Sequence, residues 1–377
     1  MNIALVCNEY PPSLAGGIGT WTQSFARGLV RKGHNVWVVG IYSGAKIGQE
    51  KDLGVSICRI PASKIPKGRA FIDRIAVQKK LAKIHQTNEI DIVEIPDYQG
   101  YGAFYAGFAP SVVRLHSLPK RWSDPVYAKK HKTSWFEKTT FTKADYLIAV
   151  SYWAEKITKK RFPLLKNIST VYYTISEVFL QSNPEEVLSQ REEIVIFAGT
   201  LADHKGIWEL GKAWPIVKRK FPNARLIIAG KDWKSNSRKQ SNQEIFQKKL
   251  SCLDADFLGP ITQEELSKYY KRATVACFPS KNETLGLVAA EALACGTPTI
   301  YTKNGPGPEI GGGGERATLI DPEDPQDIAR AICEVLSDPI PFYYKAMNAS
   351  KWVKDHFSAD VTISQSEQLY SSLSCQR

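Results

Sequence analysis

Short apolar runs alternate with helical patterns along the whole chain. Several runs are continuous and rich in β-branched residues, as in VWVVG (36–40), IDIVEI (90–95), YLIAV (146–150), IVIFAG (194–199) and RLIIAG (225–230). Such runs are typical of parallel strands that helices cover on both faces. Their alternation with helical segments predicts doubly wound α/β units.

The strand–helix pattern restarts at Ile194, after a polar stretch at 176–193. A chain of 377 residues is long enough for two domains. We therefore expect one Rossmann-like domain over 1–175, a linker over 176–193 and a second Rossmann-like domain over 194–356. Strands are expected near 2–7, 36–40, 55–60, 90–95, 111–116, 145–150, 169–173, 194–199, 224–229, 255–258, 274–279, 298–302 and 317–320. Ligands of such sheets bind at the carboxyl ends of the strands.

The N-terminal segment MNIALVCNEY predicts a first strand rather than a signal peptide. No run reaches the roughly 20 apolar residues of a membrane span. The seven cysteines are scattered and form neither a CxxC motif nor a Cys/His cluster. We expect reduced thiols, no structural zinc and a cytoplasmic location.

Positive charge is concentrated in the first half of the chain. Residues 1–190 carry 26 Lys and Arg against 15 Asp and Glu, whereas residues 191–377 carry 24 against 23, so +11 of the net +12 lies in the first half. The segments 64–86 and 120–132 combine cations with apolar or aromatic residues, which suits an anionic membrane surface. A solvated basic face and a nucleic-acid partner remain alternatives, although no nucleic-acid-binding motif is present.

The segment PSKNETLGLVAAEALACGTP (279–298) predicts an anion site at a strand end. A strand over 274–280 leads to a helix that begins at Gly286 and ends near Ala294. Free amides and the helix dipole attract anions at such a helix start. Glu283 precedes the helix and Glu291 lies inside it, so a ligand with hydroxyl groups on both sides of a phosphate would fit. Alternatively, Glu283 is a helix-terminal charge and Glu291 pairs with a lysine.

A second anion site is expected at IVIFAGTLADHKG (194–206). A strand is followed there by a turn containing Gly199, and Lys205 and Gly206 then begin a helix. A lysine ammonium is a point charge that suits phosphate oxygens.

These motifs together resemble the retaining glycosyltransferases of family four, which carry an E-x7-E signature. NEYPPSLAGGIGTWTQSFARGL, VVRLHS, ADYLIAVS, GTLADHKG, LIIAGKD, FLGPITQEELSKYYKRATV and the C-terminal HFSADVTISQSEQLYSSL are similar to family motifs in the same order. The resemblance implies the GT-B fold, with two Rossmann-like domains facing each other across a deep cleft. It also implies that the C-terminal helix, at about 357–377, packs back on the first domain. The first domain would bind the acceptor and the second the nucleotide sugar.

The resemblance also implies roles for individual residues. Glu291 would bind the ribose hydroxyls, Glu283 the donor sugar, and Lys205 the diphosphate. His116 would stabilise positive charge that develops on the sugar, and Asp97 would orient the acceptor hydroxyl. The catalytic set is thus His116, Glu283 and Lys205. The remaining donor-site residues are Gly16, Gly17, Gly19, Gly199, Thr200, Gly230, Lys231, Gly259, Pro260, Thr284, Leu285, Gly286 and Leu287.

The chain departs from the family pattern in two segments. Thr200 replaces the usual Arg, so Lys205, or His204 if it is protonated, must neutralise more of the phosphate charge. Thr174, Ile175, Ser176 and Glu177 replace the usual N-G-V-D turn before the linker.

The chain has no DxD-type carboxylate pair at a strand end, so no essential metal or other cofactor is expected. The resemblance favours UDP-glucose as the donor and a glycan or lipid-linked acceptor, as in bacterial exopolysaccharide or cell-surface polysaccharide synthesis. A GT-B epimerase or phosphorylase is an alternative enzyme. A basic nucleic-acid-binding or membrane-binding protein is the alternative from another class. A nicotinamide oxidoreductase is disfavoured because the GGIG loop lacks GxGxxG spacing.

Overall fold

The computed structural model describes residues 1–13, 17–43, 47–65, 67–117, 134–165, 167–181, 191–232, 241–249 and 255–375. The chain divides into two compact units. The N-terminal unit comprises Met1–Thr174 and Ala359–Arg377, and the C-terminal unit comprises Ile175–Ser358.

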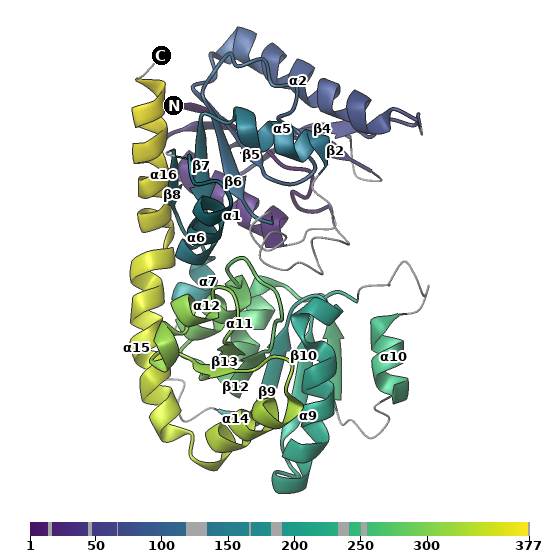
Figure 1. Cartoon of the computed structure of the whole chain (residues 1–377), viewed down its shortest axis with the longest axis vertical. Coiled ribbons are helices and arrows are strands. Elements are labelled where there is room, and N and C mark those ends of the chain that lie inside the picture. Colours follow the sequence, from purple (N-terminus) through teal and green to yellow (C-terminus); the bar gives the residue numbers. More distant parts are fainter. Residues whose placement is uncertain are drawn as a thin grey trace. The chain divides into compact units, whose positions relative to one another are not determined.

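The N-terminal unit is built on an eight-stranded sheet in the order β3-β4-β2-β1-β5-β6-β7-β8 (Figure 1). Neighbouring strands are parallel except for β3 and β4. The strands are β1 Asn2–Val6, β2 Asn35–Tyr42, β3 Gly48–Asp52, β4 Val55–Pro61, β5 Ile92–Pro96, β6 Ser111–Leu115, β7 Tyr146–Ala149 and β8 Ile168–Thr170. Its helices are α1 Gly17–Arg31, α2 Arg69–Asn88, α5 Trp135–Lys143, α6 Tyr152–Arg161 and α16 Ala359–Ser374.

Strand β3 is the strand that the sequence pattern did not predict. Its sequence, GQEKD, is polar and mostly exposed, so it lacks the apolar run that marks the other strands. It forms a hairpin with β4 through Leu53 and Gly54, which both have positive φ angles of 46° and 91°. This turn geometry matches the twist of antiparallel strands. The expectation of parallel strands therefore fails at this edge of the sheet.

The C-terminal unit is built on a six-stranded, wholly parallel sheet in the order β11-β10-β9-β12-β13-β14. The strands are β9 Glu192–Ala198, β10 Arg225–Ala229, β11 Ala255–Gly259, β12 Ala273–Phe278, β13 Thr299–Thr302 and β14 Thr318–Ile320. The helices are α7 Glu177–Leu180, α9 Ile207–Lys220, α10 Asn242–Lys249, α11 Gln263–Arg272, α12 Leu287–Ala294, α13 Gly307–Ile310, α14 Pro325–Ser337 and α15 Ile340–Phe357. The strand order reverses between β9 and β12, which is where ligands of such sheets bind.

The stretch expected to be the linker is partly structured. Helix α7 lies within it and buries Phe179 completely, with the Phe179 ring 6.0 Å from that of Tyr270. Strand β9 begins at Glu192, two residues earlier than the apolar pattern predicts. Residues 182–190 lie outside the described part of the chain.

A buried ion pair connects four elements of the N-terminal unit. Arg114 in β6 donates two hydrogen bonds to Glu94 in β5, at 2.8 and 2.9 Å, and Tyr370 in α16 donates a third to the same carboxylate. The Arg114 guanidinium also lies over the rings of Trp21 and Phe25 in α1. Buried charges are stable only when they are paired in this way, so these contacts fix the last helix of the chain (yellow in Figure 1) to the sheet.

Candidate functional site

The two predicted anion sites lie side by side at the carboxyl ends of β9 and β12. These strands are neighbours in the sheet, although the motifs that follow them are about 80 residues apart in sequence. Gly206 lies so close to Pro279 that a Cβ atom would be 1.8 Å from the Pro279 carbonyl oxygen. The Lys281 amide donates to the His204 carbonyl oxygen at 2.9 Å. Backbone contacts thus hold the two loops together.

The same loops also exchange side-chain contacts. Lys205 forms a direct ion pair with Glu283, the two residues expected to bind the diphosphate and the sugar. Lys281 pairs with Glu209 at 3.0 Å and with Asp203 at 3.4 Å. The Lys281 cluster was not predicted, because its members become neighbours only when β9 and β12 pair in the sheet.

The start of α12 has the geometry that an anion site requires. Gly286 precedes the helix with φ 87°, and a Cβ atom there would be 1.8 Å from the Tyr301 hydroxyl oxygen. That hydroxyl donates to the Leu285 carbonyl at 3.0 Å and fixes the turn. Within the described residues, the amides of Leu285, Gly286 and Leu287 have no hydrogen-bond acceptor. They are therefore available to an anion.

Glu291 is a buried carboxyl group inside α12. It is 8% exposed, and burial raises its pKa from the ordinary 4.5 to about 7. In the part of the chain that the structure describes, its carboxylate has neither a hydrogen bond nor an ion pair, so the alternative of a lysine partner finds no support there. A buried carboxyl group without donors is costly, and ligand hydroxyl groups would satisfy it.

The remaining residues of the expected donor site in this unit follow the ends of β9, β10 and β11. The Gly199 amide donates to the Ala229 carbonyl at 2.9 Å, and the Gly230 amide to the Gly259 carbonyl at 2.8 Å. These bonds extend the sheet beyond the ends of the strands. Partly or fully exposed side chains follow these ends, namely Thr200, Lys231 and Pro260. Thr284, before the start of α12, is buried.

Asp97 and His116 lie in the N-terminal unit, after the neighbouring strands β5 and β6. Asp97 is fully buried and accepts hydrogen bonds from the Ser117 amide, at 2.8 and 3.1 Å, and from the Ser117 hydroxyl at 3.3 Å. These bonds fix the residues after β6, including His116. The structure therefore shows Asp97 in a positioning contact with its own chain.

The His116 imidazole is buried against aromatic rings. Its Nδ1 lies 2.6 Å from the Tyr173 hydroxyl, and its ring stacks on Tyr173 and contacts Trp21. Burial and the nearby Arg114 guanidinium hold the pKa of His116 well below its ordinary 6.5. His116 is thus neutral, and it can stabilise positive charge through its dipole and its carbonyl group. Tyr173, which the motifs did not place in the site, is its direct partner.

Gly17 and Gly19 lie in the first turn of α1, after β1, whereas Gly16 and the basic stretch 120–132 lie outside the described residues. Among the residues that the structure describes, no three His, Cys, Asp or Glu side chains gather as metal ligands. Metal independence stays a prediction. No helix within the described ranges is long and apolar enough to cross a membrane.

The raised pKa of Glu291 predicts a stability effect that requires no ligand. A carboxyl group with a raised pKa in the folded state favours folding at low pH, and this advantage is lost as the pH rises through about 7. Glu291→Gln should therefore raise the free energy of unfolding by about 3 kcal/mol at pH 8 but only about 1 kcal/mol at pH 5. Urea unfolding at both pH values measures this difference. The exposed Glu323→Gln is the matched control, and an equal effect of both substitutions at pH 8 would contradict the burial of Glu291.

Two family models match consecutive parts of the chain. The model described as Glycosyltransferase Family 4 matches residues 15–176, and the model described as Glycosyl transferases group 1 matches residues 180–352. An uncharacterized glycosyltransferase of Methanocaldococcus jannaschii is 26% identical over 98% of both chains.

Solved structures show the same fold. Sucrose-phosphate synthase from Thermosynechococcus elongatus superposes with a TM-score of 0.83 at 20% identity, over 100% of both chains. Anabaena HepE, solved in complex with UDP-glucose, superposes with a TM-score of 0.77 at 17% identity, over 99% of this chain and 100% of that one. With one parallel and one predominantly parallel α/β sheet and both family matches, the chain belongs to the group 1 glycosyltransferases of family four and has the GT-B fold.

Proposed function

We propose that this glycosyltransferase transfers a hexose, with retention of configuration, from a nucleoside-diphosphate sugar to a glycan or lipid-linked acceptor. UDP-glucose is the favoured donor, and synthesis of bacterial exopolysaccharide or cell-surface polysaccharide is the favoured role. The observation that carries the proposal is Glu291, a buried carboxyl group without a partner in the described residues, in the helix whose first amides are free. Ribose hydroxyls would donate hydrogen bonds to the Glu291 carboxyl group, and a phosphate would accept them from the free amides.

Binding of the donor would separate the Lys205–Glu283 ion pair and give each of the two residues a partner on the ligand. Lys205 would move to the diphosphate oxygens, and Glu283 would accept hydrogen bonds from hydroxyls of the sugar. The unpaired amides at the start of α12 would hold the distal phosphate. Because each member of the pair gains a ligand partner, neither charge is left buried and unpaired.

Catalysis would depend mainly on stabilising the leaving diphosphate. Charge develops on these oxygens as the glycosidic bond breaks, and fixed amides together with Lys205 can stabilise it without a metal ion. Lys281 contributes less, because Glu209 and Asp203 already balance its charge. Neutral His116 and its carbonyl group would face the positive charge on the sugar. Attack of the acceptor from the face that the diphosphate leaves would retain configuration.

Substitution of Glu283 and substitution of Glu291 should impair different steps of the reaction. Glu283→Ala should lower kcat by about 100-fold or more, but keep nucleoside-diphosphate affinity, because it frees Lys205 for the phosphates. Glu291→Ala should weaken nucleoside-diphosphate binding by about tenfold, because the ribose hydroxyls lose their acceptor. Initial rates with UDP-glucose and calorimetric titration with UDP measure the two effects.

The exposed Glu323→Ala provides the matched control for both glutamate variants. Wild-type transfer by both Glu283→Ala and Glu291→Ala would refute the proposed donor site. Conversion of the sugar nucleotide without any acceptor would instead favour the epimerase alternative.

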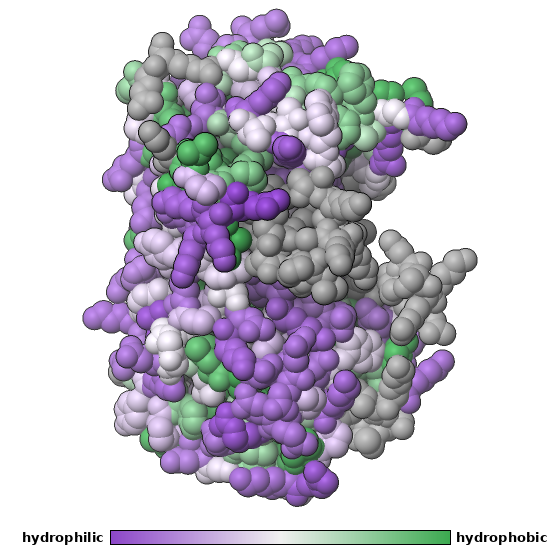
Figure 2. All heavy atoms as spheres, in the orientation of Figure 1, coloured by the Kyte–Doolittle hydropathy of each residue, from purple (hydrophilic) through white to green (hydrophobic). Residues whose placement is uncertain are grey.

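We further propose that the N-terminal unit makes peripheral contact with an anionic membrane. Large apolar side chains are exposed near the start of α2 and α5, with Ile65 55%, Phe71 48% and Trp135 63% exposed. Phe104 connects the last two, with its ring 4.8 Å from that of Phe71 and 6.2 Å from that of Trp135. Figure 2 shows hydrophobic surface (green) next to hydrophilic side chains (purple) over this end of α2. Cations border the patch, namely Lys64, Lys67 and Arg69.

The apolar residues of the basic segment 64–86 divide into two groups. Leu81 and Ile84 pack on the sheet, whereas Phe71 and Ile72 remain exposed. Exposed aromatic side chains flanked by lysines suit the interface of an anionic bilayer.

Cosedimentation with vesicles tests the membrane contact. The double variant Phe71→Ser/Trp135→Ser should bind phosphatidylglycerol vesicles about tenfold more weakly than the wild type, because it loses the inserted apolar surface. Leu164→Ser, which alters an isolated exposed apolar side chain of the same unit, should bind normally. Equal binding by all three proteins, or none by the wild type, would exclude this surface.

A further inference from the structure

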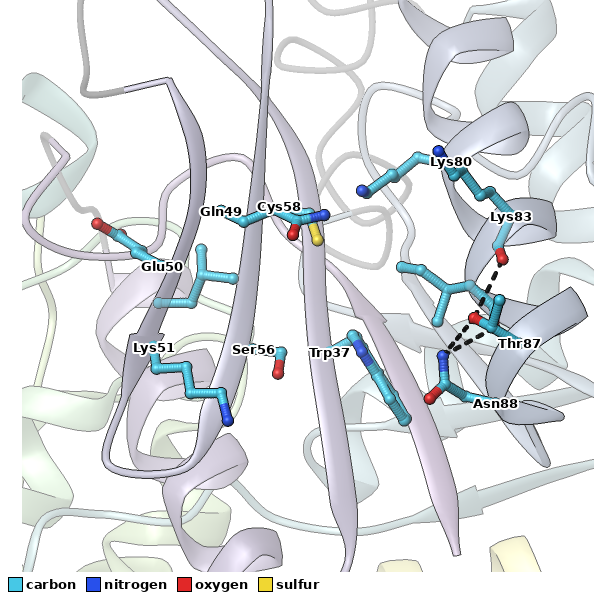
Figure 3. Close-up of a pocket in the computed structure, with 12 residues that line it drawn as sticks. Trp37, Gln49, Glu50, Lys51, Ser56, Cys58, Lys80, Lys83, Thr87 and Asn88 are labelled. Atoms are coloured by element: carbon cyan, nitrogen blue, oxygen red, sulfur yellow. Dashed lines mark hydrogen bonds between the residues drawn. The ribbon is translucent and has the colours of Figure 1, made fainter.

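A hollow of about 530 Å³ lies in the N-terminal unit between the β3–β4 hairpin and α2 (Figure 3). Its volume is in the range of about 300–1,000 Å³ that small-ligand sites have. None of the expected donor-site or acceptor-site residues lines it. It is therefore a separate feature of the fold.

Strand register explains why the sheet is hollow at this point. Trp37, Ser56 and Lys51 pair in one row across β2, β4 and β3, so their side chains share a face of the sheet. Cys58 lies on the same face, two residues after Ser56, and both are small. Ile84 of α2 closes the β2 side. The small side chains of β4 thus leave a space between the β3–β4 hairpin and α2, as Figure 3 shows.

The side chains around the hollow make it cationic. Lys51 comes from β3, and Lys80 and Lys83 come from α2. Among the residues that the structure describes, these three lysines form no ion pair. The acidic lining residue, Glu50, is neutralised by Arg59 at 2.7 Å. The hollow thus combines uncompensated positive charge with an indole ring and aliphatic surface.

The hollow lies away from the edge of the sheet that carries the proposed chemistry. Trp37 pairs with Ala4 in the middle of β1, whereas Asp97 and His116 follow the carboxyl ends of β5 and β6. A ligand in the hollow would lie against a sheet face that α2 partly covers. It would therefore serve as an effector or an anchor and not as the reacting acceptor.

We propose that this hollow binds a phosphorylated ligand with a ring or short apolar body. Lys80 and Lys83, which lie together on the α2 side of the hollow, bind the phosphate, and Trp37 and Ile84 contact the body. Lys51, on the hairpin side, adds to the positive charge around the site. Lysine ammonium groups with no competing carboxylate suit phosphate oxygens, and an indole ring stacks on flat or apolar groups. The proposal does not depend on the donor site, whose glutamates and Lys205 belong to the other unit.

Calorimetric titration of the full chain with phenyl phosphate tests the proposal. The wild type should bind it saturably, and more tightly than inorganic phosphate or phenol, which each carry only half of the recognised chemistry. Lys80→Gln/Lys83→Gln should weaken binding about tenfold, because both lysine contacts to the phosphate are lost. Lys79→Gln should bind normally, because Lys79 is exposed and adjacent in sequence but does not line the hollow.

A second variant tests the shape of the site rather than its charge. Ser56→Leu keeps all three lysines but fills the hollow, and it should also weaken phenyl phosphate binding about tenfold. Absence of saturable binding to the wild type would overturn the proposal. Equal weakening by Lys79→Gln and by Lys80→Gln/Lys83→Gln would also overturn it, because it would show non-specific attraction to a basic surface.

The phosphate could belong to a lipid headgroup or to a soluble metabolite, and vesicle binding distinguishes these two sources. Phosphatidylcholine vesicles containing phosphatidic acid would be offered to the Phe71→Ser/Trp135→Ser protein, which lacks the proposed membrane patch. Vesicle binding that Lys80→Gln/Lys83→Gln removes would assign the hollow to a lipid headgroup. Phenyl phosphate binding without vesicle binding would assign it to a soluble phosphorylated metabolite.

Discussion

The ion pair between Lys205 and Glu283 joins the two loops on which the proposed chemistry depends. Parallel pairing of β9 with β12 brings these loops together at the point where the strand order reverses. The pair places a cation and a carboxylate next to the free amides of α12. Removal of one member leaves a largely buried charge, whereas a ligand that offers a phosphate and a hydroxyl satisfies both. In the proposed function, this ligand is the donor, which replaces the contact between Lys205 and Glu283.

Burial gives the other functional groups their properties. Burial of α12 raises the pKa of Glu291 to about 7. His116 is neutral because burial among aromatic rings and the nearby Arg114 lower its pKa. Arg114 is itself held by Glu94, which also accepts from Tyr370 in the last helix of the chain. A continuous series of contacts therefore connects α16 to the His116 ring. Arg114 lies over the ring of Trp21, and Trp21 contacts His116. Stability of the N-terminal unit and the environment of His116 are coupled.

Much of the fold could be predicted, because buried parallel strands carry continuous apolar runs. Strand β3 could not, because its residues are polar and its pairing depends on a turn at Leu53 and Gly54. Motif order identified the family, and the sequence pattern placed Glu283 and Lys205 at strand ends and Glu291 inside the helix that follows. It could not show that Lys205 pairs with Glu283, that Asp97 binds Ser117, or that Glu291 lacks a partner among the described residues, because these facts depend on tertiary contacts between distant segments.

Thermal unfolding of the wild type and of Glu291→Ala with UDP, GDP and ADP, with and without EDTA, tests the central claim most directly. A ligand that binds the folded state raises the unfolding midpoint by mass action. The account predicts that one nucleoside diphosphate raises the wild-type midpoint, that EDTA leaves this shift unchanged, and that Glu291→Ala reduces it. No shift with any nucleotide, or an equal shift in the variant, would contradict a donor site at Glu291.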